Sequence, residues 1–257
     1  MLVENGIIHW WKERWYNIYK DMSKKKEIRD SLELDGLHIK ELPDFLGEVD
    51  TCYGNIDLQE NQLTSLKNLP KNVSGNLDVS YNKITSFEGG PKYVSGKLDC
   101  THNKITSLNG MPLVSGHGSI IVSENNLTSL DGLKIPNHVD ADTFRISVVG
   151  NKITNLKGCN LASIESMYGL GLASNPLKSI EGSPQIVGSL TLSFTYLESL
   201  KGGPLYVGYL YLFGVPNFKS LEGFPRSIDV LYIDRNFPFS DDDIKDYCRV
   251  KEIRRNP

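Results

Sequence analysis

The sequence predicts an α/β-type solenoid, a rod of short stacked coils that each add one strand to a parallel sheet. The first observation is a tandem repeat, because NLDVSYNKITSFEGGPKYVSG at 76–96 is followed directly by KLDCTHNKITSLNGMPLVSG at 97–116. The second is that this pattern recurs in ten copies between Ser31 and Asn236, mostly at steps of 20 to 22 residues. The third is a helical pattern at each end of the array. A fixed period of this size indicates a repeat fold whose coils contact only their neighbours.

Each copy follows the register x-L-x-L-x-x-N-x-I/L-x-x-L-x-G-x-P. Leu77 and Val79 alternate with polar residues, so they share one face of a short strand. Ile84 and Phe87 point to the same core from the returning arm. The side-chain amide of the repeated asparagine can satisfy backbone groups that turn inward. It stands at Asn61, Asn82, Asn103, Asn125, Asn151, Asn175 and Asn236, and Thr195 and Val215 replace it in two copies. A coil of about 21 residues leaves little room for a helix, so we expect a mostly non-helical convex side.

Both ends are predicted to be helical caps, since a solenoid must cover its terminal apolar faces. In 1–30, Trp11 and Trp15 fall at helical spacing with Ile18 and Met22, which predicts an N-terminal capping helix or, alternatively, a partner-binding helix. In 240–257, Ser240 precedes three aspartates, and Arg249, Lys251, Arg254 and Arg255 follow. This charge order favours a C-terminal capping helix. The solenoid itself is expected over 31–239.

The repeated N-K-I-T-S-L-x-G-x-P motif resembles the leucine-rich-repeat family, particularly its short-repeat bacterial type and similar phage arrays. The resemblance covers Ser31 to Asn236. It implies about ten coils with a parallel concave sheet. It also implies binding of proteins through that concave face, as in secreted effectors of pathogens.

Composition excludes several classes of protein. The net charge of -3 and the pI of about 6.0 do not favour nucleic acid or an anionic membrane. The chain has no apolar run long enough to span a bilayer. Cys52, Cys100, Cys159 and Cys248 are far apart, which favours reduced thiols and a cytoplasmic location.

No catalytic constellation is visible in the sequence. None of the five histidines belongs to a metal-binding motif. Cys100 and His102 come nearest to a nucleophile and base, but the register places Cys100 in the core. The stretch 116–119 lacks the Lys-Ser/Thr of a phosphate loop. We therefore predict that the chain is not an enzyme and needs no cofactor and no metal.

The register also identifies the outward residues of each predicted strand. In the N-terminal half, Asp57, Asp78 and Asp99 form a ladder about 4.8 Å apart. Like charges at this spacing oppose folding. One interpretation is a cationic patch of a partner, or a bound cation, on the ladder. The other is hydrated aspartates that are tolerated at little cost.

In the C-terminal half, the outward residues are aromatic, at Phe194, Tyr209, Tyr211, Phe213 and Tyr232. Tyrosine often dominates the energetics of interfaces, so these residues are candidates for partner contact. The alternative is that the rings cover the inner surface or pack on the C-terminal cap. Two longer steps, at Asp131 to Phe144 and Leu161 to Tyr168, are expected to form loops on one edge or, alternatively, to be misaligned or irregular repeats.

These observations favour a protein-binding module that uses its concave face, such as a phage or pathogen protein that binds or inhibits a host protein. Its partner is expected to be a protein with a basic patch, without direct nucleic-acid binding. Two alternatives are an acidic mimic of nucleic acid that occupies a basic protein, and a carbohydrate-binding module supported by the tyrosines.

Overall fold

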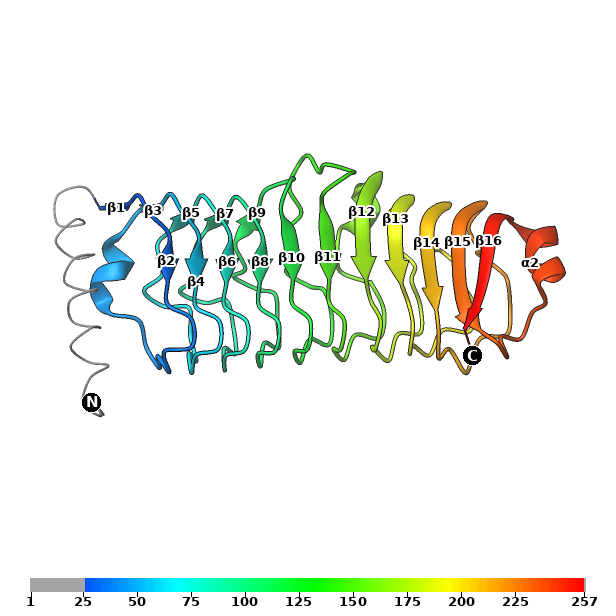
Figure 1. Cartoon of the computed structure of the whole chain (residues 1–257), viewed down its shortest axis with the longest axis horizontal. Coiled ribbons are helices and arrows are strands. Elements are labelled where there is room, and N and C mark those ends of the chain that lie inside the picture. The colour runs from blue at the N-terminus through cyan, green and yellow to red at the C-terminus, as the bar shows by residue number, and fades with distance from the viewer. Residues whose placement is uncertain (1–25, 257) are drawn as a thin grey trace.

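A computed structural model of the chain describes residues 26–256 and shows a parallel β-solenoid of about eleven coils with very little helix. The coils lie side by side in a row (Figure 1). The predicted solenoid and repeat are therefore confirmed. The predicted number of ten coils is wrong, because the segment expected to form the C-terminal helix supplies an eleventh strand.

Eleven parallel strands, one from each coil, form what we call the long sheet. Their bounds are β2 (Leu32–Glu33), β4 (Ile56–Asp57), β6 (Leu77–Asp78), β8 (Leu98–Asp99), β10 (Ser119–Ile121), β11 (Arg145–Ser147), β12 (Ser166–Gly171), β13 (Ile186–Thr191), β14 (Tyr206–Leu212), β15 (Ser227–Asp234) and β16 (Arg249–Asn256). A second, five-stranded sheet runs beside its N-terminal half. It consists of β1 (Glu27–Ile28), β3 (Thr51–Cys52), β5 (Asn72–Val73), β7 (Tyr93–Val94) and β9 (Leu113–Val114).

The number of residues at one bend explains why the second sheet ends halfway along the array. In an N-terminal coil, three residues separate the buried Val73 from the buried Leu77, and the chain makes two strands. In a C-terminal coil, only two residues separate Val187 from Leu190, and one strand runs through the bend. The bend is tightly packed, since a Cβ at Gly75 would lie 2.7 Å from the carbonyl oxygen of Gly54.

The core is one apolar column that runs the length of the array. Leu77, Leu98 and Ile120 are paired in neighbouring strands and are fully buried. Phe87 of the return arm packs against the same column from the other side. Burial of one such side chain stabilises the fold by about 1.5–3 kcal/mol, so the repeated inward positions account for the architecture.

The asparagine amides satisfy buried backbone groups, as the sequence predicted, and in doing so they bond neighbouring coils to one another. Asn82 Nδ2 donates hydrogen bonds to the carbonyl oxygens of Leu58, Val79 and Ser80 at 2.8, 3.1 and 3.1 Å. Its Oδ1 accepts from the backbone N–H of Leu63 at 2.8 Å. The same arrangement recurs at Asn61, Asn103, Asn125, Asn151 and Asn175. The prediction fails at Asn236, which is exposed.

The C-terminal end corrects the predicted helix over 240–257. Helix α2 spans only Asp241–Tyr247, and Ser240 caps it as expected, with Asp243 completing a reciprocal capping box. The chain then becomes extended and forms β16, which pairs with β15. The basic residues Arg249, Lys251, Arg254 and Arg255 therefore lie on a strand and not in the last turn of a helix.

At the N-terminal end, the tryptophans of the predicted capping helix lie outside the described residues. The prediction that the helical segment extends to residue 30 is wrong, because Glu27–Ile28 is strand β1 and pairs with β3.

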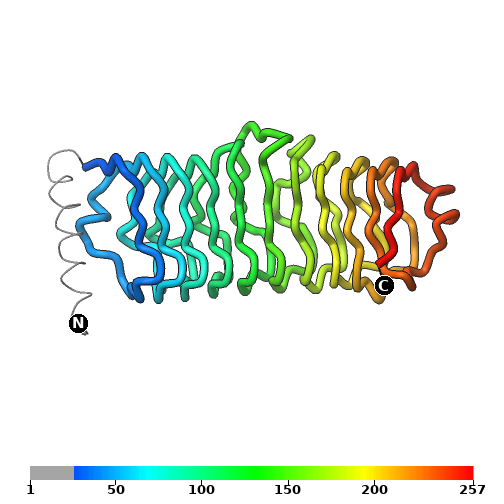
Figure 2. Tube along the Cα trace, in the orientation of Figure 1, coloured from blue at the N-terminus to red at the C-terminus, as the bar shows by residue number. Residues whose placement is uncertain are grey.

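Helix elsewhere in the described residues is limited to two 3₁₀ turns, η1 (Asp44–Glu48) and η2 (Leu161–Ser163), which agrees with a mostly non-helical convex side. The structure supports a parallel β-solenoid and does not support the leucine-rich-repeat type in particular. The first long step protrudes from the row of coils between β10 and β11 (Figure 2). The second was wrongly expected to be a loop, because 161–168 forms η2 and the start of β12.

Candidate binding surface on the long sheet

One outward residue from each strand of the long sheet forms a continuous line that we call the central row. Strand pairing places these residues side by side in the order Glu33, Asp57, Asp78, Asp99, Ile121, Ser147, Gly171, Thr191, Tyr211, Tyr232 and Arg254. The row begins acidic, passes through small residues and ends aromatic and basic. The register of the repeat identifies every member but Arg254 as the outward residue between two inward ones on its strand. The spacing of Val250 and Ile253, which repeats that of Ile228 and Leu231, could have revealed it.

The three aspartates of the predicted ladder lie together and are held in fixed orientations. Asp78 Oδ1 accepts hydrogen bonds from the backbone N–H and the hydroxyl of Ser80 at 3.0 and 2.6 Å. Asp99 makes the equivalent pair with Thr101 at 3.0 and 2.6 Å. Asp57 accepts from the backbone and side-chain N–H groups of Gln59, both at 3.1 Å. These bonds orient each carboxylate and offset part of the repulsion along the ladder.

Lys97 neutralises one half of this acidic end. Its ammonium lies 3.5 Å from Asp78 Oδ2 and 3.2 Å from Asp99 Oδ2. Partial burial disfavours its charge, but the attraction of Asp99 and Asp78 outweighs that effect and raises the pKa of Lys97. The register of the repeat placed Lys97 on the exposed face but gave no sign of this bridging role.

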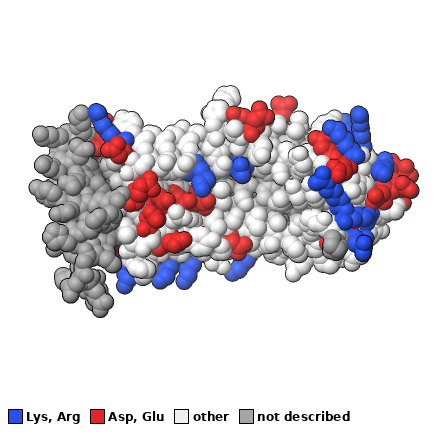
Figure 3. All heavy atoms as spheres, in the orientation of Figure 1, with Lys and Arg blue, Asp and Glu red and all other residues white. Residues whose placement is uncertain are grey.

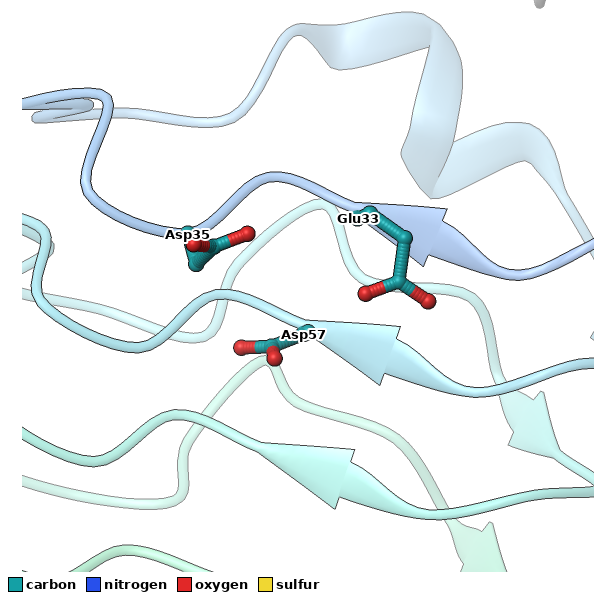
Figure 4. Close-up of side chains that lie close together, drawn as sticks. All are labelled: Glu33, Asp35 and Asp57. Carbon is teal, nitrogen blue, oxygen red and sulfur yellow. The ribbon is translucent and has the colours of Figure 1, made fainter.

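The other half of the acidic end has no such counter-charge among the residues that the structure describes. Carboxylate oxygens of Glu33, Asp35 and Asp57 lie within 4.8 Å of one another, and Figure 4 shows that they come from two adjacent coils. Within residues 26–256, none of the three forms an ion pair. Such a group could hold a cation, although exposed acidic groups often gather without one. In Figure 3, acidic side chains gather at this end of the sheet face, and the middle of the face carries few charged side chains.

At the aromatic end, the structure brings three of the predicted residues into direct contact. The rings of Tyr211 and Tyr232 stack with centroids 4.5 Å apart and an interplanar angle of 6°. Phe213 meets Tyr232 edge-on at 6.4 Å. Burial, followed by the neighbouring Tyr232, raises the pKa of Tyr211. The hydroxyl therefore stays protonated at neutral pH and can donate a hydrogen bond.

Arg254 closes the row beyond Tyr232. Its Nη1 donates to the Tyr232 hydroxyl at 2.8 Å, and its guanidinium carbon lies 5.3 Å from the Tyr232 ring centroid. The guanidinium also binds both carboxylate oxygens of Glu252 at 2.7 and 3.1 Å. These contacts orient the guanidinium and hold it at the end of the aromatic stack.

The other two predicted aromatic residues lie beside the stack. Tyr209 is on β14 one row away, and about half of its side chain is exposed. Phe194 is 64% exposed and follows β13. Its ring lies over the next coil, since a Cβ at Gly214 would fall 2.4 Å from Phe194 Cδ1. Within the described part of the chain, Phe194 has no ring contact with the Tyr211–Tyr232 stack.

Phe194 belongs to a column of strained residues along one border of the sheet face. The residue before the asparagine position has a positive φ in coil after coil, at Glu60, Tyr81, His102, Glu124, Ser174 and Phe194, while Gly36, Gly150 and Gly214 take the same place in other coils. A side chain in this conformation costs roughly 1–2 kcal/mol compared with the right-handed region. The sequence placed most of these residues on the exposed face but gave no sign of their backbone conformation. Because the conformation recurs in nearly every coil, it belongs to the turn of the repeat.

Two other features do not form a site. Cys100 is fully buried, and burial raises the pKa of its thiol well above the usual value, as expected for an inert core cysteine. A depression of about 660 Å³ lies away from the sheet face and is lined in part by Lys178, Glu181 and Glu198. Its charged side chains are exposed, and pairs such as Lys219–Glu198 are solvated.

No protein-family model matches the sequence, and no curated protein matches it. Among the described residues, no helix is both long and apolar enough to cross a membrane.

Proposed function

We propose that the chain is a non-enzymatic protein-binding module and that its contact surface is the outward face of the long sheet. The observation that carries the proposal is the contrast between inward and outward residues of the same strands. Inward positions repeat as aliphatic residues from coil to coil, whereas the central row changes from carboxylates to stacked tyrosines. The repeat explains the inward aliphatic residues and leaves the outward residues of the central row free to contact a ligand.

The ligand that fits this face has cationic groups opposite the acidic end and makes close contact at the Tyr211–Tyr232 stack. Stacked tyrosines that stay partly exposed are typical of interface hot spots. The resemblance to short-repeat leucine-rich-repeat proteins of bacteria and phages supports a role in binding or inhibiting a host protein. All four cysteines are free, which supports a reducing compartment such as the cytoplasm.

The test uses the tagged full chain as bait in extract from its native source. A captured protein is identified, purified and titrated against the wild type and variants. Tyr211→Ala/Phe213→Ala is expected to weaken binding at least about ten-fold, because hot-spot residues contribute about 2 kcal/mol or more. Asp57→Asn/Asp78→Asn/Asp99→Asn is expected to weaken it as well. A matched control, Thr85→Ala/Thr106→Ala, removes exposed residues outside the sheet face and leaves affinity unchanged.

Unchanged affinity in both face variants, with unchanged circular dichroism, would remove the sheet face as the contact. Two further assays separate the alternative functions. Competition with DNA for the captured protein would indicate an acidic mimic of nucleic acid. Binding on a glycan array that is lost in Tyr211→Ala would indicate a carbohydrate module.

A further inference from the structure

The residues of the central row are complementary in charge and shape to the same row read in the opposite order. We infer that the outward face of the long sheet binds a second copy of this chain, with the two sheets face to face and their long axes antiparallel. The inference rests on the proposed function and names the partner of that same surface.

The row has eleven members, so Ser147 is its central residue. A two-fold axis that lies between the two sheets at the level of Ser147, parallel to the strands, reverses the order of the row in the second copy. Each residue then meets the one at the mirrored position. The opposed pairs are Glu33 with Arg254, Asp57 with Tyr232, Asp78 with Tyr211, Asp99 with Thr191, and Ile121 with Gly171, while Ser147 meets its own copy.

Every carboxylate of the row is thereby opposed by a group that can donate a hydrogen bond. Glu33 meets a guanidinium, and each aspartate meets a hydroxyl. Glu33, which forms no ion pair in the described part of the chain, meets the Arg254 guanidinium of the partner copy, which also binds Glu252 within its own chain. Charge-assisted hydrogen bonds of this kind are about twice as strong as neutral ones.

The other two-fold arrangement opposes more like charges than this one, in which the exposed Arg145, two residues before Ser147 on β11, is the charged outward residue that meets its own copy. An axis parallel to the solenoid axis would place Asp57 opposite Asp57 and Asp78 opposite Asp78. Like charges directly opposite are destabilising, and they would recur at four consecutive strands, β2, β4, β6 and β8.

Side-chain size is also complementary when the order of the row is reversed. Ile121 is the one aliphatic side chain of the row, and it meets Gly171, the one position without a side chain. The outward residues two positions further along each strand also avoid acid against acid, since Asp35 meets Asn256 and Gln59 meets Asp234. The apolar Val149 lies at the centre of this second row and meets its own copy.

The face is large enough for a specific but moderate dimer. Eleven strands at about 4.8 Å span roughly 48 Å. Two outward rows with their side chains cover a width of roughly 15 Å, which gives about 700 Å² for each copy. Standard interfaces bury about 800 Å² per partner, so we expect dimers in the micromolar range.

The test is sedimentation velocity of the full chain from about 1 to 100 µM, a range set by that expected affinity. The wild type is expected to shift from monomer to dimer. Glu33→Arg places arginine opposite Arg254 at both ends of the dimer, and Arg254→Glu places glutamate opposite Glu33. Each variant alone is expected to dimerise at least about ten-fold more weakly than the wild type, a loss of about 1.4 kcal/mol.

A one-to-one mixture of the two variants is the decisive sample. In the heterodimer, the arginine introduced at position 33 of one copy would face the glutamate introduced at position 254 of the other. At the opposite end, the unchanged Glu33 and Arg254 would face each other. The mixture is therefore expected to recover dimers that neither variant forms alone. Circular dichroism of each variant controls for its fold.

A wild type that remains monomeric across the range overturns the inference. So does a dimer whose strength is unchanged in both variants, because it would use another surface. A one-to-one mixture of Glu33→Arg and Arg254→Glu that does not recover dimers also overturns it. Should these results occur while a captured protein still depends on Tyr211 and Phe213, the proposed function stands and only the second copy as its partner falls.

Discussion

The side chain of Asn103 is bonded to the backbone of Ile84 in the preceding coil, where Oδ1 accepts the Ile84 N–H at 2.9 Å. Its Nδ2 also donates to the carbonyl oxygens of Val79 and Cys100 at 2.9 and 3.1 Å. Asn103→Leu leaves these buried backbone groups without hydrogen-bond partners. We expect the free energy of unfolding in urea to fall by about 3–5 kcal/mol, since each unsatisfied buried group costs about 1–3 kcal/mol. The matched control is Asn236→Leu at the exposed copy of the motif, for which we expect a change within about 0.5 kcal/mol. Equal losses in the two variants would contradict the role of the asparagine ladder.

Lys97 is expected to relieve repulsion within the aspartate ladder. Lys97→Met removes the ammonium that lies between Asp78 and Asp99. We expect a loss of about 0.5–1 kcal/mol in the free energy of unfolding at low salt, which is the range of a partly exposed ion pair. The loss should shrink when salt is raised, because screening weakens both the pair and the uncovered repulsion. Urea titrations at two salt concentrations measure both values, and a loss that does not depend on salt would assign Lys97 a packing role instead.

The positive-φ column makes a prediction about backbone strain at Ser174, whose φ is 54° and whose side chain is exposed. Ser174→Gly should stabilise the chain by about 0.5–1 kcal/mol, because relief of the left-handed strain exceeds the entropy lost by the more flexible glycine. Ser174→Ala is the control, since alanine keeps the strain and should not stabilise. A gain for alanine equal to that for glycine would show that loss of the hydroxyl, and not relief of strain, causes the change.

The buried thiol of Cys248 is expected to lower the free energy of unfolding at alkaline pH. Burial raises the pKa of its thiol from 9.0 to about 11. The unfolded thiol ionises near its ordinary pKa while the folded thiol stays protonated. Its stabilising contribution is thus fully present below about pH 9 and is lost as pH rises from about 9 to 11. Urea titrations at about pH 8 and 10.5 should show a larger fall for the wild type than for Cys248→Ala. Equal falls would mean that Cys248 does not contribute to the pH dependence.

The strand positions were predictable because every coil carries the same local pattern. Leu77 and Val79 alternate with polar residues, and Asn82 marks the turn that follows. The central row follows from that register as far as Tyr232. Arg254 was missed because Ser240 and the charges after it describe a real helix start but give no sign of where the helix ends. Pairing with β15 then overrides local preference and makes 249–256 a strand.

The remaining features depend on contacts between coils that the sequence does not display. The stack of Tyr211 on Tyr232 and the bridge from Lys97 to two aspartates arise from side-chain rotamers in adjacent coils. The positive φ at Phe194 is hidden because glycine occupies the same position only in some coils, as at Gly214. The second sheet depends on a difference of one residue at a bend.

The central claim is that the outward face of the long sheet is the binding surface, and carboxylate footprinting tests it most directly. Carbodiimide labelling of the chain is compared with and without a purified protein partner, followed by mass spectrometry. Protection of Asp57, Asp78 and Asp99 is expected, while Glu88 and Asp131, which are exposed outside the face, keep their reactivity. Protection of Glu88 and Asp131 with unchanged labelling of the three ladder aspartates would contradict the claim.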